Sequence, residues 1–205
     1  MATSSGALAQ VQEEPKRPTA AEPWLVLAAF IMNSAFNAFI CMNFSPISVL
    51  TQKVLKVEES EVAWLYTGFL LTVTCSMPFA LMLVLRCEAV ALSVSVCLNT
   101  LCAWIRWIGV KRRSYSLCLL SALVSGAGAA PILPCPAQLS QQRFPPHRWS
   151  LTTTLAIQAN YTGWMLGCVL VPMLVQDGDD LERFLFWQAL VSLVVLATFV
   201  GFYRK

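Results

Sequence analysis

Polar side chains recur inside two strongly apolar segments of this chain, with the spacing of one helix face. In the later segment Thr154, Gln158 and Tyr161 fall on one stripe at about 100° per residue, which Met165 and Cys168 continue. Hydroxyls and amides in such a stripe can hydrogen-bond to a neighbouring helix or bind a small polar solute. An amide facing lipid would find no partner, so we expect this face to point to protein or to a water-filled space.

A second stripe with the same spacing lies in the first apolar segment. Its members are Asn33, Asn37, Cys41, Phe44 and Ser48, with Ser34 and Ser45 at its edge. Two interpretations stay open, namely hydrogen-bonded helix packing and a shared cavity. The bulk of Tyr161 and Phe44 favours a cavity. Gly163 and Gly167, by contrast, form a G-x-x-x-G pattern that suits close helix packing.

The two stripes together predict a solute site near the middle of the membrane. We expect it to be lined by Asn37, Cys41, Phe44, Gln158, Asn160 and Tyr161. Other chemistry is poorly supported, because the single His147 lies in a loop and no nucleophile–base pair is apparent. The eight cysteines show no C-x-x-C spacing. We therefore expect no enzyme activity, no cofactor and no metal.

The composition is that of a membrane protein. Of the 205 residues, 57% are hydrophobic and 12% are charged, whereas soluble domains carry about a quarter charged residues. A net charge of +3 without a basic stripe gives no reason to expect nucleic acid as a partner. Membrane lipid is the expected surrounding.

Six apolar runs are long enough to cross a bilayer core, which needs roughly 20 helical residues. They lie near 24–50, 62–85, 89–109, 115–139, 150–175 and 181–203. The predicted fold is therefore all-α, a six-helix transmembrane bundle formed by residues 23–205. Residues 1–22 are polar and are predicted to be a disordered tail.

Prolines and glycines predict bends in two of these spans. The residues concerned are Pro46 in the first span and Gly126, Pro131, Pro134 and Pro136 in the fourth. Gating and a passive kink are both open explanations. Arg106 lies between Trp104 and Trp107 near one end of the third span, and we expect it to extend to the membrane interface.

Three segments resemble one group of major facilitator proteins. They are WLVLAAFIMNSAFNAF in the first span, CLNTLCAWIRWIGV in the third and ANYTGWMLGCVLVPMLV in the fifth. The group is that of the feline leukaemia virus subgroup C receptor-related transporters. Its members tend to show W-x-V-L and N-x-F, then L-N-C-L-G-A-W, then G-N-Q-L-G with a V-P-P-V-L-V type ending. The resemblance covers about Trp24 to Lys205, with its spacing.

The resemblance implies the N-terminal half of a twelve-helix transporter whose substrate binds between two six-helix halves. It implies a cytoplasmic N-terminus, which the balanced Lys and Arg distribution does not decide. It also implies transport of choline, ethanolamine or haem by alternating access, with the plasma membrane as the default location. The second half would come from further sequence or from a homodimer.

The chain departs from the family pattern at three places. Cys41 stands where the family has a substrate-facing tryptophan, and Tyr161 replaces the glutamine after the matching Asn160. The loop between the second and third spans keeps only Arg86 and a displaced Glu88 of the family's charged latch. These departures support an alternative, a truncated or degenerate paralogue that acts as a non-transporting regulatory or structural partner.

Overall fold

The computed structural model describes residues 22–203, and every regular element in that range is a helix. The predicted tail, apart from Glu22, lies outside the described residues. The elements are α1 (Glu22–Cys41), η1 (Ser45–Ile47), α2 (Ser48–Leu55), α3 (Glu59–Arg86), α4 (Glu88–Lys111), α5 (Tyr115–Ala129), α6 (Cys135–Arg143), η2 (Pro146–Arg148), α7 (Trp149–Leu174) and α8 (Gly178–Tyr203). The prediction of an all-α bundle is confirmed.

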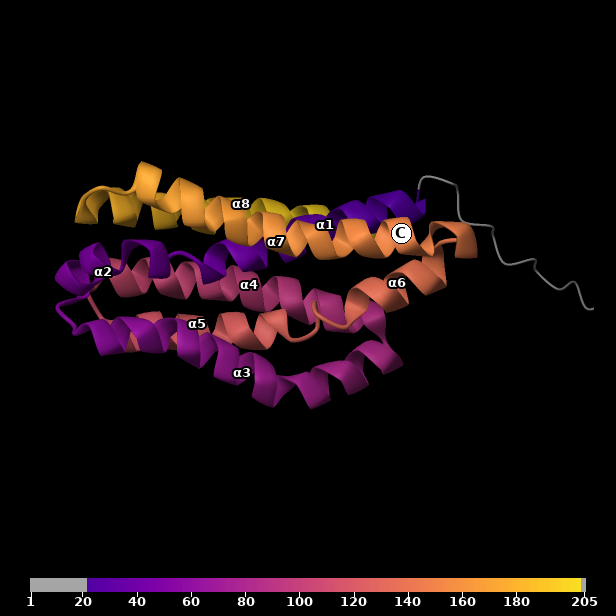
Figure 1. Cartoon of the computed structure of the whole chain (residues 1–205), viewed down its shortest axis with the longest axis horizontal. Coiled ribbons are helices and arrows are strands. Elements are labelled where there is room, and N and C mark those ends of the chain that lie inside the picture. The colour runs from indigo at the N-terminus through magenta and orange to yellow at the C-terminus, as the bar shows by residue number, and fades with distance from the viewer. Residues whose placement is uncertain (1–21, 204–205) are drawn as a thin grey trace, which may run out of the picture.

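The long helices run side by side in an elongated bundle (Figure 1). α1 packs mainly against α7 and α8, α4 against α5 and α8, and α3 against α5. α1 therefore has neighbours on most sides, whereas α7 borders mainly α1 and α6. This difference decides how their polar stripes are surrounded.

Four helical segments in residues 22–203 are long and apolar enough to cross a membrane. They are Glu22–Leu55, Glu59–Arg86, Glu88–Lys111 and Gly178–Phe202. α5 is apolar but shorter. α7 is also long, and it carries Gln158 and Asn160 within its apolar sequence, but it does not meet the same measure of length and apolar composition. All six predicted segments are helical, while their number as membrane spans stays a prediction.

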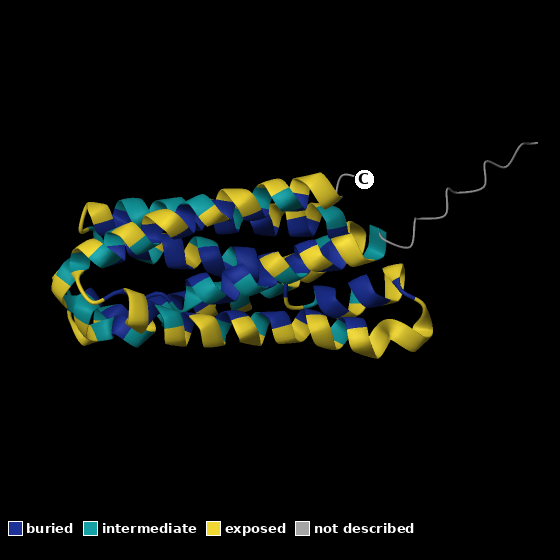
Figure 2. Ribbon diagram, turned by 90° about the horizontal axis from the view of Figure 1, so that it is seen from above, coloured by how far each residue is buried: buried dark blue, intermediate teal, exposed yellow. Residues whose placement is uncertain are grey.

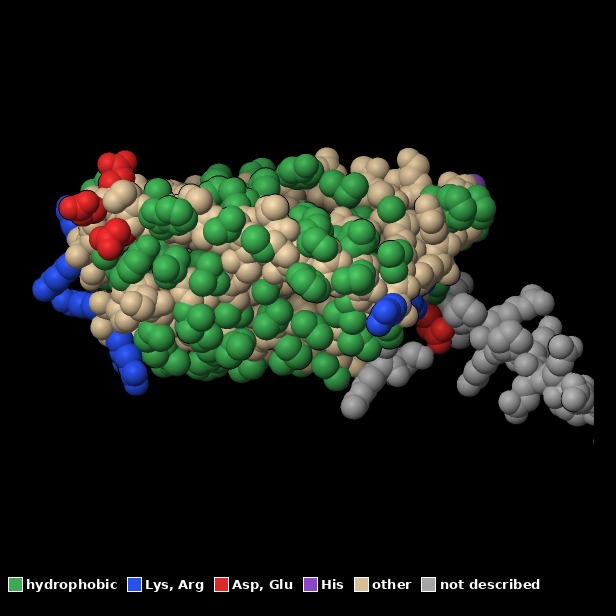
Figure 3. Space-filling model, turned by 90° about the horizontal axis from the view of Figure 1, so that it is seen from below, with side chains coloured by type: hydrophobic (Ala, Val, Ile, Leu, Met, Phe, Trp, Pro, Cys, Tyr) green, Lys and Arg blue, Asp and Glu red, His purple; other side chains and the backbone are tan. Residues whose placement is uncertain are grey.

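The surface supports a membrane location. Large apolar side chains such as Phe79, Trp187 and Met173 are exposed on the outside of the bundle. Figure 3 shows a broad apolar surface along the bundle, with charged side chains gathered toward its two ends. Figure 2 shows the buried residues on the facing sides of the helices. In a membrane the exposed apolar surface would contact lipid.

Two of the predicted spans are interrupted. α1 ends at Cys41, and Pro46 lies in the short 3₁₀ turn that precedes α2. Pro131 and Pro134 lie in the turn at 130–134 that separates α5 from α6, and Pro136 lies in the first turn of α6. Proline lacks the amide hydrogen that would continue the helix. The helices are interrupted at these prolines, while bending and gating both stay predictions.

Gly126 has a different place from the prolines. It lies inside α5, and a Cβ atom there would come within 2.6 Å of the Phe69 carbonyl oxygen on α3. α7 approaches α1 even more closely, because a Cβ on Gly163 would lie 2.1 Å from the Ala35 carbonyl oxygen. A Cβ on Gly167 would lie 2.7 Å from Met42 Cβ. The G-x-x-x-G pattern therefore serves close packing, as its spacing predicted.

Candidate functional site

A pocket of about 350 Å³ opens along the bundle between α1, α3, α7 and the turn that joins α5 to α6. It is lined by Ser34, Asn37, Phe69, Leu70, Val73, Ala129, Ile132, Leu133, Pro136, Ala156, Ile157, Asn160, Tyr161 and Trp164. The break between α5 and α6 contributes the apolar side chains of Ile132 and Leu133. A pocket of this size suits a small organic molecule.

Three of the six predicted lining residues border this pocket: Asn37, Asn160 and Tyr161. Asn37 is almost fully buried, and its amide is held by the protein. Asn160 is half-buried and donates to Ser34 Oγ over 3.4 Å. Tyr161 remains 57% exposed. Their role in binding a solute stays a prediction.

The other three predicted residues lie elsewhere. Phe44 is buried in an apolar cluster around η1. Cys41 is half-buried at the end of α1 and packs near Phe69 without bordering the pocket. Gln158 is exposed on α7 and does not border the pocket. Gln158 and Tyr161 are about one helical turn apart. The predicted stripe therefore has one member at the pocket and one outside it.

Sequence reasoning missed the contribution of α3 and one tryptophan. Phe69 and its neighbours Leu70 and Val73 form an apolar wall of the pocket. Trp164 makes an edge-to-face contact with Tyr161, with ring centroids 5.9 Å apart. Its position three residues after Tyr161 could have signalled a shared face. The α3 wall carried no such signal, because its side chains resemble those of any lipid-facing helix.

A chain of hydrogen bonds supports the pocket from behind. It joins α1, α4 and α5 through four buried side chains, Asn33, Asn37, Ser95 and Asn99. The bond from Asn37 to Asn99 Oδ1 is 2.6 Å long, and that from Asn99 to Asn33 Oδ1 is 2.9 Å long. These contacts confirm hydrogen-bonded helix packing for the first stripe, while Asn37 also borders the pocket.

The pocket is chemically a neutral, aromatic site. Its polar groups are hydroxyls, amides and the Trp164 indole, and none of the described residues that line it carries a charge. Phe69, Tyr161 and Trp164 supply aromatic side chains from two helices. Such rings attract organic cations through their π electrons. The described residues contain no cluster of three or more His, Cys, Asp or Glu side chains able to hold a metal.

Arg106 does not lie at the interface, so that prediction is wrong. Its side chain is only 2% exposed and lies among α1, α4 and α5. The guanidinium donates to the Ile40 carbonyl and to Ser121 Oγ, and it lies 5.1 Å from the Phe44 ring centre. The Ile40 carbonyl lies in the last turn of α1 and also accepts from the Asn43 backbone nitrogen over 3.2 Å. Arg106 therefore caps the broken end of α1.

Comparison with known proteins supports one family, although no family model matches the chain. An uncharacterized MFS-type transporter of Caenorhabditis elegans is 25% identical over 96% of this chain and 35% of its own length. The choline/ethanolamine transporter FLVCR1 of Felis catus is 26% identical over 82% of this chain and 30% of its own length. Solute carrier family 49 member A3 of Danio rerio is 28% identical over 77% of this chain and 35% of its own length.

These relatives support a place for the chain in the major facilitator superfamily, in the feline leukaemia virus subgroup C receptor-related group. The chain corresponds to the N-terminal half of such a transporter. It spans about a third of the length of the curated relatives it matches. As in this family, it is a multi-pass integral membrane protein.

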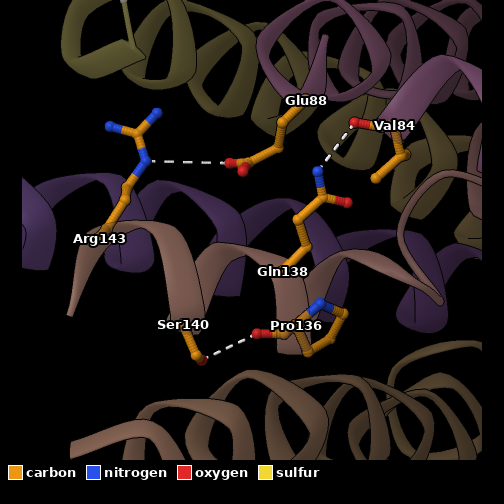
Figure 4. Close-up of polar contacts among 6 residues, drawn as sticks. All are labelled: Val84, Glu88, Pro136, Gln138, Ser140 and Arg143. Carbon is orange, nitrogen blue, oxygen red and sulfur yellow. Dashed lines mark hydrogen bonds and ion pairs between the residues drawn. The ribbon is translucent and has the colours of Figure 1, made fainter. Parts of the chain in front are cut away.

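Glu88, one of the two latch residues expected from this family, lies opposite Arg143 and beside Gln138 (Figure 4). Glu88 begins α4, is nearly buried, and pairs with Arg143 of α6 over 3.9 Å. Gln138 of α6 donates to the Val84 carbonyl at the end of α3. Arg86 is exposed. The displaced Glu88 thus still makes a charged contact between two helices, and its role in switching stays a prediction.

Proposed function

We propose that the pocket between α1, α3 and α7 is part of a transport pathway for a small organic solute. The observation that carries this proposal is a neutral, aromatic cavity of about 350 Å³ beside buried amides in a membrane bundle. Major facilitator relatives over most of this chain support the same conclusion. Such a cavity is of no use for packing, because filling it with larger apolar side chains would bind the helices better.

A choline-like or ethanolamine-like cation is the substrate that we infer. Several relatives are named as choline/ethanolamine transporters. The rings of Phe69, Tyr161 and Trp164 offer the π faces that bind a quaternary ammonium group, and this binding needs no carboxylate. Tyr161 and Trp164 would supply the aromatic surface that the family draws from a tryptophan at the position of Cys41.

Transport would proceed by alternating access against a second six-helix half. A pocket with one open side needs an opposing bundle to close it, and rocking of two bundles exposes the site to each side in turn. The second half would be supplied by further sequence or by another copy of the chain. In either arrangement α3 and α7 would face it, since both helices line the open pocket and expose large apolar side chains.

Uptake of radiolabelled choline and ethanolamine by cells that express the protein tests this proposal. We expect Tyr161→Leu to reduce uptake about tenfold, because the ring face is lost while an apolar side chain remains. Gln158→Leu is the matched control, since Gln158 lies one turn away on α7 and outside the pocket. It should leave uptake within about twofold of the wild type.

Surface expression of each variant is measured alongside uptake. Loss of uptake for Tyr161→Leu at normal surface expression supports transport through the pocket. Equal uptake for Tyr161→Leu and the wild type contradicts it. If the wild-type protein takes up neither solute but changes uptake by another transporter, the non-transporting partner is the correct function.

A further inference from the structure

In the hydrogen-bond chain behind the pocket, which group donates and which accepts is fixed. The chain starts at a carbonyl at the end of α5. Gly128 is the penultimate residue of α5, where the turn at 130–134 interrupts the helical hydrogen-bond pattern. Its carbonyl oxygen accepts from Ser95 Oγ over 2.6 Å. A carbonyl can only accept, so the single hydroxyl proton of Ser95 is used in this bond.

The bond that Ser95 donates determines how two asparagines, Asn33 and Asn99, are oriented. Since the Ser95 proton is committed, its oxygen is the acceptor for the Asn33 amide nitrogen at 3.1 Å. The oxygen of Asn33 is then turned to Asn99, whose nitrogen donates to it over 2.9 Å. Asn99 in turn offers its oxygen to Asn37. Each amide is thereby oriented by the previous one.

Asn37 ends the chain at the pocket with its nitrogen facing the protein. That nitrogen donates to Asn99 Oδ1 over 2.6 Å and to the Ser125 carbonyl over 3.4 Å, which uses both amide hydrogens. Among the described residues, no donor bonds Asn37 Oδ1. This oxygen is also not fully enclosed by the protein. The free oxygen is therefore the group that Asn37 presents to the pocket.

We propose that this relay, defined as Gly128, Ser95, Asn33, Asn99 and Asn37, makes Asn37 a fixed hydrogen-bond acceptor that selects solutes carrying a hydroxyl or amino hydrogen. A solute of the same shape with only acceptor atoms meets the Asn37 oxygen and gains no bond. Among the described residues Asn160 makes one side-chain bond, from its nitrogen to the Ser34 hydroxyl over 3.4 Å, so its amide is held less firmly than that of Asn37. Ser95, Asn33 and Asn99 are positioning residues, since none of them borders the pocket.

This inference deepens the proposed function, and it rests on that function only in taking the pocket as the solute site. The break between α5 and α6 gains a role that gating does not require. It frees the Gly128 carbonyl, and that carbonyl sets the direction of the relay. Removing the Ser95 hydroxyl leaves the long 3.4 Å bond from Asn37 to the Ser125 carbonyl as the remaining contact that orients the relay, so Asn33, Asn99 and Asn37 should turn over together more readily. Selectivity should then fall without loss of the pocket.

The first test needs no solute. The purified protein is labelled with ¹⁵N-asparagine in lipid nanodiscs, and hydrogen exchange of the side-chain amides is followed by NMR. The chain has only five asparagines, so single substitutions assign the signals. We expect the Asn37 amide to exchange at least about tenfold more slowly than that of Asn160, because its hydrogens face the protein. Equal rates in the wild-type protein would overturn the proposal.

Ser95→Ala and Ser93→Ala form the matched pair. Both serines lie on α4, but Ser93 is exposed and its hydroxyl bonds only the Ala89 carbonyl on its own helix. Ser95→Ala should raise the exchange rate of the Asn37 amide toward that of Asn160, and Ser93→Ala should leave it unchanged. Identical exchange of Asn37 in the two variants would refute the relay.

The second test measures selectivity with two probes, choline and its O-methyl ether, which differ by one hydroxyl hydrogen. The wild-type protein should bind choline about fivefold more tightly, the value of one neutral hydrogen bond. Ser95→Ala should lower this ratio below about twofold, and Ser93→Ala should keep it. Equal affinities in the wild-type protein would overturn the selection. If neither probe binds, the proposed substrate is wrong, while the amide exchange still decides the relay.

Discussion

α1 and α7 cross at two glycines, yet their polar side chains lie in opposite surroundings. On α1, Asn33 and Asn37 are almost fully buried and bonded to α4 and α5. On α7, Tyr161 is 57% exposed and Gln158 also lies open. α1 is enclosed by several helices, while α7 lies at the edge of the bundle. The neighbours of a helix, more than its own polarity, decide whether a polar stripe stabilises the fold or meets a solute.

The contact that joins the two stripes should give the largest effect. Gly163→Ala places a methyl group 2.1 Å from the Ala35 carbonyl oxygen, and neither backbone can yield without separating α1 from α7. We expect a loss of about 3 kcal/mol or more in the free energy of unfolding. Thermal unfolding in detergent measures it. Gly201→Ala is the control, because no atom lies within 4 Å of its Cβ position, and equal melting temperatures would contradict the tight crossing.

The next effect separates the buried stripe from the exposed one. Asn99→Ala removes the partner of Asn33 and Asn37 and should cost about 1–2 kcal/mol, from two interhelical hydrogen bonds in a membrane protein. Gln158→Ala should change stability by less than about 0.5 kcal/mol. Unfolding in lipid bicelles measures both variants. A similar loss of stability for the two variants would mean that neighbouring helices also cover the α7 stripe.

The smallest effect on stability should come from Asn160, the member of the α7 stripe that borders the pocket. Its bond to Ser34 is long, at 3.4 Å, so Asn160→Ala should cost less than about 0.5 kcal/mol. Choline uptake should nevertheless fall about fivefold, because a polar group of the pocket is lost. Unchanged uptake would show that Asn160 serves only helix packing. Gln158→Ala, which lies on the same helix outside the pocket, is the control and should leave uptake unchanged.

The sequence predicted the helices well because apolar length and proline positions are local properties. All six segments were found, and the interruptions fall at Pro46 and at Pro131 and Pro134. The candidate site was predicted only in part. Periodicity places Gln158 and Tyr161 on one stripe, but the direction of that stripe depends on which helices pack against α7. The apolar wall at Phe69 depends on a distant segment, which no local pattern reports.

The position of Arg106 also could not be predicted from local sequence. Near the end of an apolar run, flanked by tryptophans, an arginine is expected to reach water. The early end of α1 at Cys41 instead exposes a backbone carbonyl inside the bundle, which the guanidinium can bind. That partner becomes visible only when the break in α1 is known.

The burial of Arg106 places a positive charge inside the bundle, where a membrane voltage would act on it. The groups that hold the guanidinium are a carbonyl, a hydroxyl and an aromatic ring, and no described carboxylate forms an ion pair with it. Its positive charge is therefore balanced by dipoles alone and remains a net charge within the electric field. Moving one elementary charge across the full membrane changes the energy by about 2.3 kcal/mol per 100 mV. If the bundle rocks as proposed, a change in the depth of Arg106 would move this charge through a fraction of that field, and the resting potential of the cell would then bias which way the bundle faces.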